Sequence, residues 1–385
     1  MKNNINQLKA TIKKIFDYLH QNPEPSWQEY ETTVYLKTLL ESYGFTVQTF
    51  DDCTGLVVEV GEGNICVGVR ADIDALWQNV DGIFRANHSC GHDAHMTMVI
   101  GTMLLLKEMN AWPKNGKLKF IFQPAEEKGT GALKLIEKGV VDNLDFLYGV
   151  HLRPLEELKF GEASPATFHG SATFMTGIIR GVDAHGARPH LGQNAIEVGA
   201  TLVNELNRIH INPMVPASVK ITSFHAGSET GNLIPGEATF SLDLRAQTNE
   251  VMIELTNRVI HLAEIIATLY QVEISLTTTG YVAAATVDET AKSFMEQAII
   301  ETLGQENNKA PIITPGGEDF HFYTLKRPNI KATMLGLGCD LQPGLHHPKM
   351  SFNREAMYNG IEIITRAVLY TFEKANCLEG EQNEN

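Results

Sequence analysis

The feature that most constrains the fold is a change in the order of predicted elements near residue 170. Before it, buried strands such as "ICVGVRADIDA" and "KLKFIFQ" alternate with helical segments such as "HMTMVIGTMLLLKEM", which indicates a mostly parallel sheet covered by helices. Residues 171–282 instead predict a β-α-β-β-α-β order, which makes a small ferredoxin-like domain by itself. We therefore predict an α/β domain of residues 1–170 and 283–385, interrupted by an inserted α+β domain of residues 171–282.

Composition agrees with this division and excludes several classes of function. A chain of 385 residues is long for one domain. Its 31 basic and 46 acidic residues give a net charge of −15, which repels phosphate backbones, so no nucleic-acid partner is expected. The five cysteines include no CxxC pair, which argues against a disulfide framework.

The N-terminus lacks the continuous apolar core of a signal peptide, and "MVIGTMLLL" is too short to span a bilayer, so we expect a cytoplasmic protein without a membrane partner.

The segment "SCGHDAH" is the first candidate for chemistry. Cys90 and His92 are ligand types that suit zinc or a similar transition metal. They lie two residues apart where a loop enters a predicted helix, so both side chains could point into one cleft. The alternative is an ordinary helix N-terminus capped by Ser89 or Asp93.

The segment "FQPAEE" is the second candidate, because Glu126 and Glu127 follow a strand that stops at Pro124. If the backbone stays extended there, adjacent side chains point to opposite sides. One carboxylate could then bind metal while the other acts as a general base. The alternative is a solvated acidic turn.

Three histidines complete the set of candidates. His151, in "YGVHLRP", lies at the carboxyl end of a predicted strand, where open α/β sheets place their ligands. His346, in "PGLHHPKM", and His185, in "VDAHGARPH", lie in predicted loops. Each has a structural explanation on its own, but together with the cysteine and the glutamates they have the composition of a two-metal hydrolytic site. The chain has no GxSxG elbow and no Walker sequence.

Taken together, the motifs resemble one family, the aminoacylase/carboxypeptidase-type di-metal amidohydrolases. The most similar subgroup contains hippurate hydrolases, N-acetyl-diaminopimelate deacetylases and indole-acetyl-amino acid hydrolases. The resemblance spans nearly the whole chain, and its motifs occur in the family's order: "LHQNPEPSWQEYET", "RADIDAL", "CGHDAH", "QPAEE", "GVH", "NLIPGEATFSLDLR", "GGEDFHFY" and "LHHPKMSFN".

The resemblance implies a zinc-peptidase-like α/β catalytic domain with a mixed sheet and an inserted ferredoxin-like lid domain that mediates homodimers. It also implies two divalent metal ions, which could be manganese, zinc, nickel or cobalt. Glu126 matches the family's general base. The matching metal ligands are Cys90, His92, Glu127, His151 and His346.

The resemblance further assigns residues in the predicted lid. His185 matches a histidine that reaches the active site of the other subunit and stabilises the oxyanion. Asn232 and Arg245 match positions associated with the carboxylate of the substrate, and a guanidinium can clamp a carboxylate with two parallel hydrogen bonds. Gly317 matches a loop whose backbone lies near the substrate.

We therefore expect a metal-dependent amidohydrolase that cleaves N-acyl amino acids or related small amide conjugates. A dipeptidase or carboxypeptidase, and a metal-dependent peptide-binding protein without catalysis, are the alternatives. The chain departs from its relatives where "RADIDAL" runs into "WQNV" and where the lid reads "GVDAHGARPH", which leaves the substrate unassigned. Cys90 is expected to be an exposed thiol of low pKa in the metal-free site, and the tail "LEGEQNEN" to be disordered.

Overall fold

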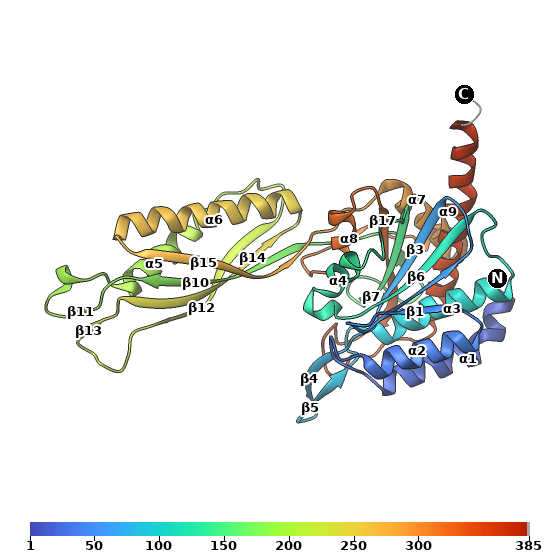
Figure 1. Cartoon of the computed structure of the whole chain (residues 1–385), viewed down its shortest axis with the longest axis horizontal. Helices are drawn as coiled ribbons and strands as arrows, with labels where there is room; N and C mark the ends of the chain where they lie inside the picture. The colour runs from blue at the N-terminus through green and yellow to red at the C-terminus, as the bar shows by residue number, and fades with distance from the viewer. Residues whose placement is uncertain (383–385) are drawn as a thin grey trace. The chain divides into compact units, whose positions relative to one another are not determined.

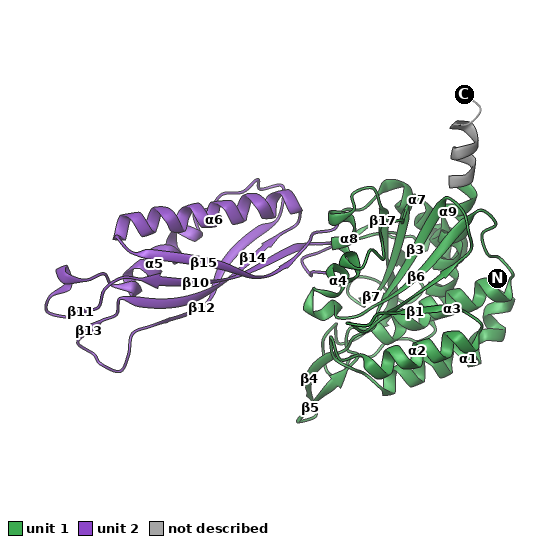
Figure 2. Cartoon of the chain, in the orientation of Figure 1, with its two compact units in different colours: residues 1–167, 286–312, 319–385 green, residues 168–285, 313–318 purple. Residues whose placement is uncertain are grey.

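A computed structural model describes the backbone of residues 1–382 and the side chains of residues 1–374. The chain forms two compact units (Figure 2): unit 1 contains Met1–Thr167, Thr286–Ile312 and Asp319–Asn385, and unit 2 contains Phe168–Ala285 and Ile313–Glu318. That each unit folds as a separate domain stays a prediction. The tail at residues 378–385, predicted to be disordered, lies outside the described side chains.

Unit 1 is built on a seven-stranded mixed sheet with the strand order β1-β2-β6-β3-β7-β17-β8. Its four central strands are parallel: β3 (Ile65–Asp72), β6 (Gly116–Gln123), β7 (Phe146–Pro154) and β17 (Lys331–Leu341). The outer strands run antiparallel to their neighbours: β1 (Val47–Thr49), β2 (Leu56–Val60) and β8 (Ala163–Ser164). All residues of β3 are buried, as its continuous apolar run predicts for a central strand. The mixed sheet confirms the predicted fold class of this unit.

Helices cover both faces of this sheet (Figure 1). One face packs against α1 (Lys2–Gln21), α2 (Tyr30–Ser42), α3 (His92–Glu108), α7 (Glu289–Leu303) and α9 (Ala356–Gln382). The other face carries the shorter helices α4 (Gly131–Glu137) and α8 (His321–Lys326). α3 is buried continuously from His92 to Leu106 because it lies between the sheet and its neighbouring helices, which explains why residues 98–106 are almost all apolar.

A hairpin of β4 (Leu76–Val80) and β5 (Ile83–Asn87) projects from unit 1 (Figure 1). Its turn residues, Asp81 and Gly82, have φ values of 53° and 89°. Two consecutive positive φ angles are typical of the type I′ turn that Asp-Gly favours. The sequence analysis predicted no strands here.

Unit 2 has the predicted β-α-β-β-α-β order. Its antiparallel sheet has the order β12-β14-β10-β15, which is the ferredoxin-like arrangement. Alternate residues of β14 are buried, so one face of the sheet packs on the two helices. The main elements are β10 (Ser171–Arg180), α5 (Ala195–Leu206), β12 (Ala217–Ala226), β14 (Glu237–Ala246), α6 (Asn249–Tyr270) and β15 (Glu273–Val282).

Short elements complete the described chain. In unit 2, β11 (Ala184–His185) pairs with β13 (Leu233–Ile234). The others are β9 (Thr167–His169), β16 (Ile312–Thr314) and the 3₁₀ turns η1 (Glu126–Lys128), η2 (Pro189–Leu191) and η3 (Gln305–Asn307).

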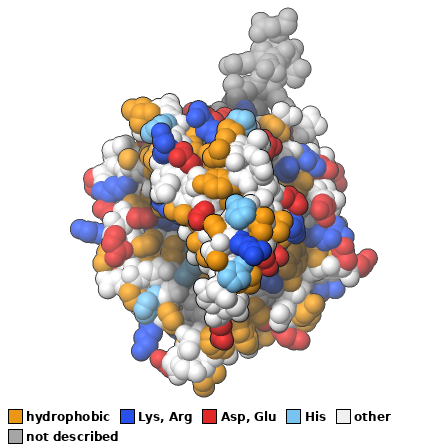
Figure 3. Space-filling view, turned by 90° about the vertical axis from the view of Figure 1, so that its left-hand side faces the viewer, with side chains coloured by type: hydrophobic (Ala, Val, Ile, Leu, Met, Phe, Trp, Pro, Cys, Tyr) orange, Lys and Arg blue, Asp and Glu red, His pale blue; other side chains and the backbone are white. Residues whose placement is uncertain are grey.

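The charges on the surface and the apolar character of the helices are relevant to the partners that the protein could bind. Acidic and basic side chains are interspersed, with hydrophobic ones between them, on the face of the molecule that Figure 3 shows. Such a face lacks the single-sign basic field that attracts phosphate backbones. Within the described residues, none of the helices combines the length and the apolar character that a membrane crossing requires.

Candidate metal centre

The candidate residues of unit 1 meet at the carboxyl edge of its sheet. Asp72, at the end of β3, pairs with Gln123, at the end of β6. The turn that carries Glu126 and Glu127 follows β6, and His151 lies in the last part of β7. Parallel strands end at the same edge, so residues that are distant in the sequence come together here.

The N-terminus of α3 brings Cys90 and His92 to this edge. The helix begins at His92, after Gly91 with a φ of 89°. A β-carbon on Gly91 would come within 2.8 Å of the Leu152 side chain, so both the backbone conformation and the close approach favour glycine. The N-cap residue is Gly91, which makes no side-chain capping bond, and within the first turn Oδ1 of Asp93 accepts the N–H of Ala94 at 2.8 Å.

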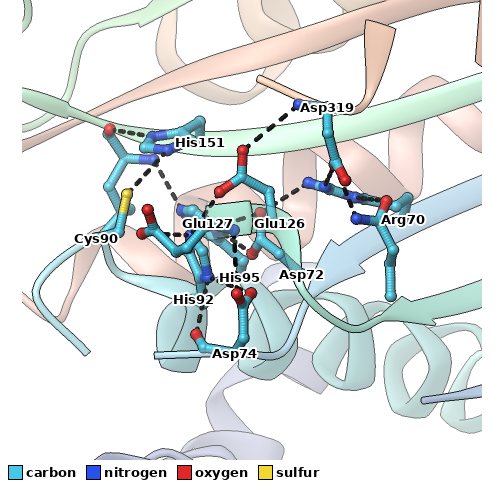
Figure 4. A network of polar contacts seen from close by, with 12 residues as sticks. Arg70, Asp72, Asp74, Cys90, His92, His95, Glu126, Glu127, His151 and Asp319 are labelled. Carbon is cyan, nitrogen blue, oxygen red and sulfur yellow. Dashed lines mark hydrogen bonds and ion pairs between the residues drawn. The ribbon is translucent and has the colours of Figure 1, made fainter. Parts of the chain in front are cut away.

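Donor atoms from all five predicted ligands converge (Figure 4 labels all but His346). In the described chain, five groups of residues have ligand atoms within 4.8 Å of one another, and three of these groups contain two or more of the predicted ligands. The three are Cys90 with His92 and His151, Cys90 with Glu127 and His346, and His92 with Glu126 and Glu127. The Sγ atom of Cys90 lies 3.5 Å from Nε2 of His151. Nε2 of the half-exposed His346 lies 3.4 Å from Oε1 of Glu127.

Hydrogen bonds orient two of the imidazoles toward the cluster. Nδ1 of His92 lies 2.9 Å from the backbone carbonyl oxygen of Asp74, and Nδ1 of His151 lies 2.7 Å from that of Leu152. A carbonyl oxygen only accepts, so both Nδ1 atoms donate. In the neutral imidazoles Nε2 then carries the lone pair, and this is the atom that faces the cluster. The arrangement is the usual one for histidine ligands of metals.

The donor set fits divalent cations. His92 Nε2 and Glu127 Oε1 are buried and have no hydrogen-bond partner within the described part of the chain, and such atoms are costly unless water or an ion satisfies them. Burial raises the pKa of Glu127 to about 7. Burial and then the Glu127 charge raise the pKa of the Cys90 thiol well above its ordinary value. Cations would offset these penalties, because they stabilise the carboxylate and the thiolate.

The expectation of an exposed, low-pKa thiol at Cys90 is wrong. The side chain is buried, with 6% of its surface exposed, and without a cation the burial favours the protonated thiol.

The expectation of an extended backbone at the glutamate pair is also wrong. Ala125 has a left-handed conformation with a φ of 50°, and Glu126 and Glu127 then form a 3₁₀ turn. Both carboxylates consequently approach the same atom, His92 Nε2, at 3.9 and 3.8 Å (Figure 4).

Two buried carboxylates hold this turn in place. The backbone N–H of Ala125 donates to Glu29 at 2.9 Å, and that of Glu127 donates to Asp74 at 3.0 Å. Asp74 also accepts a hydrogen bond from Ser26 at 2.6 Å. The unusual conformation of the turn therefore depends on residues that are distant in the sequence.

A buried polar network positions the residues at this edge of the sheet. The guanidinium of Arg70 bonds Asp72 at 2.7 Å and Asp319 at 2.9 Å (Figure 4). Asp72 in turn contacts Nδ1 of His95 at 2.8 Å, while Nε2 of His95 accepts from the N–H of Leu152 at 3.0 Å. Both nitrogens of His95 are thus engaged, so it orients neighbours rather than offering a ligand atom. Charged residues on the buried strand "ICVGVRADIDA" were the available signal.

The four predicted residues of unit 2 fall into two groups. His185 and Asn232 are close, because the N–H of Gly186 donates to the carbonyl oxygen of Asn232 at 2.8 Å. They belong to the β11–β13 end of the unit, beyond the start of β14 (Figure 1). Arg245 lies near the other end of β14. At the rise of an antiparallel strand it is about 27 Å from Glu237, the first residue of that strand. One chain therefore does not bring Asn232 and Arg245 together.

Gly317 lies at the same end of the unit 2 sheet as Arg245. Arg245 pairs with Ala172, which pairs with Val282 on the next strand. A β-carbon on Gly317 would lie 3.1 Å from the Val282 side chain. Arg245 also bonds Asp243 through two nitrogens, at 2.7 and 3.0 Å.

A mixed α/β unit that gathers cysteine, histidine and glutamate donors at the carboxyl edge of its sheet is typical of metal-dependent hydrolases. Residues 68–370 match the family model described as Peptidase family M20/M25/M40, and the chain belongs to this family. The predicted resemblance is thereby confirmed.

Curated relatives agree. The chain is 29% identical to an N-acetyl-L-cysteine deacetylase of Bacillus subtilis, over 99% of this chain and 91% of the relative. It is 31% identical to an N-acetyldiaminopimelate deacetylase of Streptococcus thermophilus, over 94% and 98%. It is 30% identical to IAA-amino acid hydrolase ILR1-like 5 of Arabidopsis thaliana, over 79% and 73%. The protein is a hydrolase that acts on amide bonds.

Solved structures show the same fold. A putative aminohydrolase from methicillin-resistant Staphylococcus aureus matches with a TM-score of 0.86 and 25% identity, over 95% of this chain and 97% of the other. The YXEP protein of Bacillus subtilis, described as a dinuclear metal binding peptidase from the M20 family, matches with a TM-score of 0.81 and 26% identity, over 97% and 99%.

Proposed function

We propose that this protein hydrolyses N-acyl amino acids or closely related small amide conjugates at a centre of two divalent metal ions. The observation that carries the proposal is the convergence of five donor residues around the buried atoms His92 Nε2 and Glu127 Oε1, which form no hydrogen bond within the described chain. The names of the curated relatives, two deacetylases and an amino acid conjugate hydrolase, support the substrate class.

Five residues would hold the ions. Their sulfur, nitrogen and oxygen atoms allow zinc, manganese, nickel or cobalt. When bound, two such ions lower the pKa of a water molecule and polarise the carbonyl of the amide. The proposed ligands are Cys90, His92, Glu127, His151 and His346.

Glu126 is the proposed general base. Its carboxylate lies beside the ligands, with Oε2 3.9 Å from His92 Nε2, and 11% of its side chain is exposed. It would take a proton from the attacking water and deliver it to the departing amine. The N–H of Asp319, 3.5 Å from Glu126 Oε1, helps to orient the carboxylate. A protein that only bound peptides would need no base at this position.

His185 is the proposed donor to the oxyanion. Its Nδ1 accepts the N–H of Ala187 at 3.0 Å, so the neutral ring carries its proton on the exposed Nε2. An N–H aimed at the developing negative charge stabilises the transition state.

The separation within unit 2 supports a homodimer. If Asn232 and Arg245 bind one substrate carboxylate, they must come from two copies of the chain, because about 27 Å of strand lies between them. We propose that His185 and Asn232 of one copy act with Arg245 and Gly317 of the other, and that unit 2 is the lid and dimerisation domain. We further propose a cytoplasmic enzyme without membrane or nucleic-acid partners.

A substrate panel tests this function. Metal-free protein is reconstituted separately with manganese, zinc, nickel and cobalt and assayed with N-acyl amino acids, dipeptides and longer peptides. Release of a carboxylic acid and a free amino acid from the acylated substrates supports the proposal. Cleavage of peptides alone would support a dipeptidase or carboxypeptidase instead.

A further inference from the structure

A pocket of about 380 Å³ opens beside the metal centre in unit 1. Its wall includes Glu127, a proposed metal ligand, and the neighbouring Lys128. Most of the remaining wall is apolar and comes from Pro25, Ala75, Leu76 and Trp77. Its volume lies within the range of about 300–1,000 Å³ that is typical of small-molecule sites.

Trp77 is unusually exposed for its size. It lies on β4, and 61% of its surface is accessible although the rest of the pocket wall offers apolar neighbours. A large aromatic side chain that is left in water at the mouth of a concave site often marks a place for a ligand. The indole offers a flat face, which favours stacking with another ring.

Hydrogen bonds fix the wall relative to the metal ligands. The side-chain amide of Gln78, next to Trp77, donates to the carbonyl oxygen of His346 at 3.0 Å. Asn87, on the paired strand β5, donates to the carbonyl oxygen of Pro348 at 3.1 Å. The hairpin is therefore tied to the loop that carries a proposed ligand.

The part of the wall formed by Pro25 and Ala75 is also held in place. Pro25 forms a β-bridge with Ala75, and the N–H of Ala75 donates to the carbonyl oxygen of Glu24 at 2.8 Å. A pocket that is formed before the substrate arrives loses little conformational entropy on binding.

We propose that this pocket receives the acyl group of the substrate, and that Trp77 makes the enzyme favour flat aromatic acyl groups over acetyl. The inference rests on the proposed amidohydrolase function. Glu127 places the pocket next to the bond to be cleaved. An aromatic ring would stack on Trp77 and cover Leu76, whereas an acetyl group has no ring to stack on the indole.

The test compares the N-benzoyl and N-acetyl derivatives of one amino acid. Trp77→Ala should lower kcat/KM for the benzoyl substrate by about tenfold or more, since a lost ring contact of about 1.4 kcal/mol corresponds to that factor. The value for the acetyl substrate should stay within about twofold. Phe84→Ala is the matched control, because Phe84 is an equally exposed aromatic residue of the same hairpin, at 62%, and does not line the pocket.

The outcomes separate this inference from the proposed function. Equal losses on both substrates, or an equal effect of Phe84→Ala, would overturn the role of Trp77. A wild-type enzyme that cleaves the acetyl but not the benzoyl substrate would overturn the aromatic preference while the amidohydrolase function stands. Activity on neither substrate with any of the four metals would overturn both.

Discussion

His92 and Asp74 form the contact that orients the centre of the site: Nδ1 of His92 lies 2.9 Å from the carbonyl oxygen and 3.3 Å from the carboxylate of Asp74. The same carboxylate accepts the N–H of Glu127. A single buried aspartate thus positions a histidine and a glutamate that come from different parts of the chain. Groups of this kind tune a metal site without binding the metal themselves.

Replacing Asp74 should therefore weaken metal binding. Asp74→Ala removes the acceptor for the Glu127 N–H and leaves Glu29 as the remaining carboxylate that holds the turn, so we expect metal affinity to fall by about 10–100-fold. Competition with a chelator measures the affinity. Asp51→Ala, at an exposed position, is the control and should match the wild type. Unchanged affinity in a folded Asp74→Ala protein would show that the contact is dispensable.

Replacing Glu126 should separate chemistry from metal binding. Glu126→Gln keeps the size of the side chain but removes the base, so we expect kcat to fall by about 10²–10⁴-fold. The metal content, determined by elemental analysis, should stay at the wild-type level. The exposed Glu62 provides the control variant Glu62→Gln, with both properties unchanged. Substantial turnover by Glu126→Gln would refute the assignment.

Replacing Cys90 should affect both metal positions. Cys90 takes part in two of the donor groups, one with His151 and the other with His346. We expect Cys90→Ala to reduce the metal content from about two ions per chain to less than one, because both groups lose their thiolate. Cys66→Ala, at a buried position near the amino end of β3, is the control. Full occupancy in Cys90→Ala would exclude the thiolate as a ligand.

The sequence predicted the regular elements well because their signals are local. The buried run of β3 and the apolar helix α3 follow from residues that are adjacent in the chain. The β4–β5 hairpin was missed although Asp81 and Gly82 are a strong turn signal, because the flanking "LWQNV" and "IFRAN" lack a clear alternation of apolar and polar residues.

The parts of the site that could not be predicted depend on distant residues. The turn at Glu126 is bent because Glu29 and Asp74 hold its backbone, and no local pattern carries that information. The burial of Cys90 likewise comes from tertiary packing. The candidate ligands came from the order of the motifs along the chain, through the resemblance to a known family, because each residue taken alone also had a structural explanation.

The pH dependence of the free energy of unfolding should reveal the ionisation of Glu29. Burial raises the pKa of this carboxyl from 4.5 to about 7 in the folded protein. As the pH rises, Glu29 ionises at a lower pH in the unfolded chain than in the folded protein. The stability that the protonated Glu29 carboxyl contributes is therefore complete below pH 4.5 and is lost as the pH rises through about 7. The loss amounts to about 3 kcal/mol for a shift of about 2.5 pKa units.

Glu29→Gln should remove this dependence, because an amide can still accept the Ala125 N–H but does not titrate. Denaturant unfolding of the metal-free proteins between pH 4 and 8 measures the difference. The wild type should lose stability relative to Glu29→Gln as the pH rises. Glu31→Gln, at an exposed position nearby, should run parallel to the wild type. A constant difference between wild type and Glu29→Gln would contradict the raised pKa.

His185 should act on the partner's site if the dimer is arranged as proposed. His185→Ala should lower kcat by about 10²-fold with little change in the melting temperature, because the side chain is exposed and its bond to the Ala187 N–H lies at the surface. His190→Ala, at another exposed position of the same loop region, is the control.

Mixing two inactive variants tests whether His185 of one copy acts in the active site of the other copy. In a mixed dimer of His185→Ala and Glu126→Gln, only a contribution from the other copy gives one site both an intact Glu126 and an intact His185. Random mixing makes half of the dimers mixed, with one working site in each, so about a quarter of wild-type activity should return. If His185 served the site of its own chain, no mixed dimer would have a complete site, and the mixture would stay as inactive as its components.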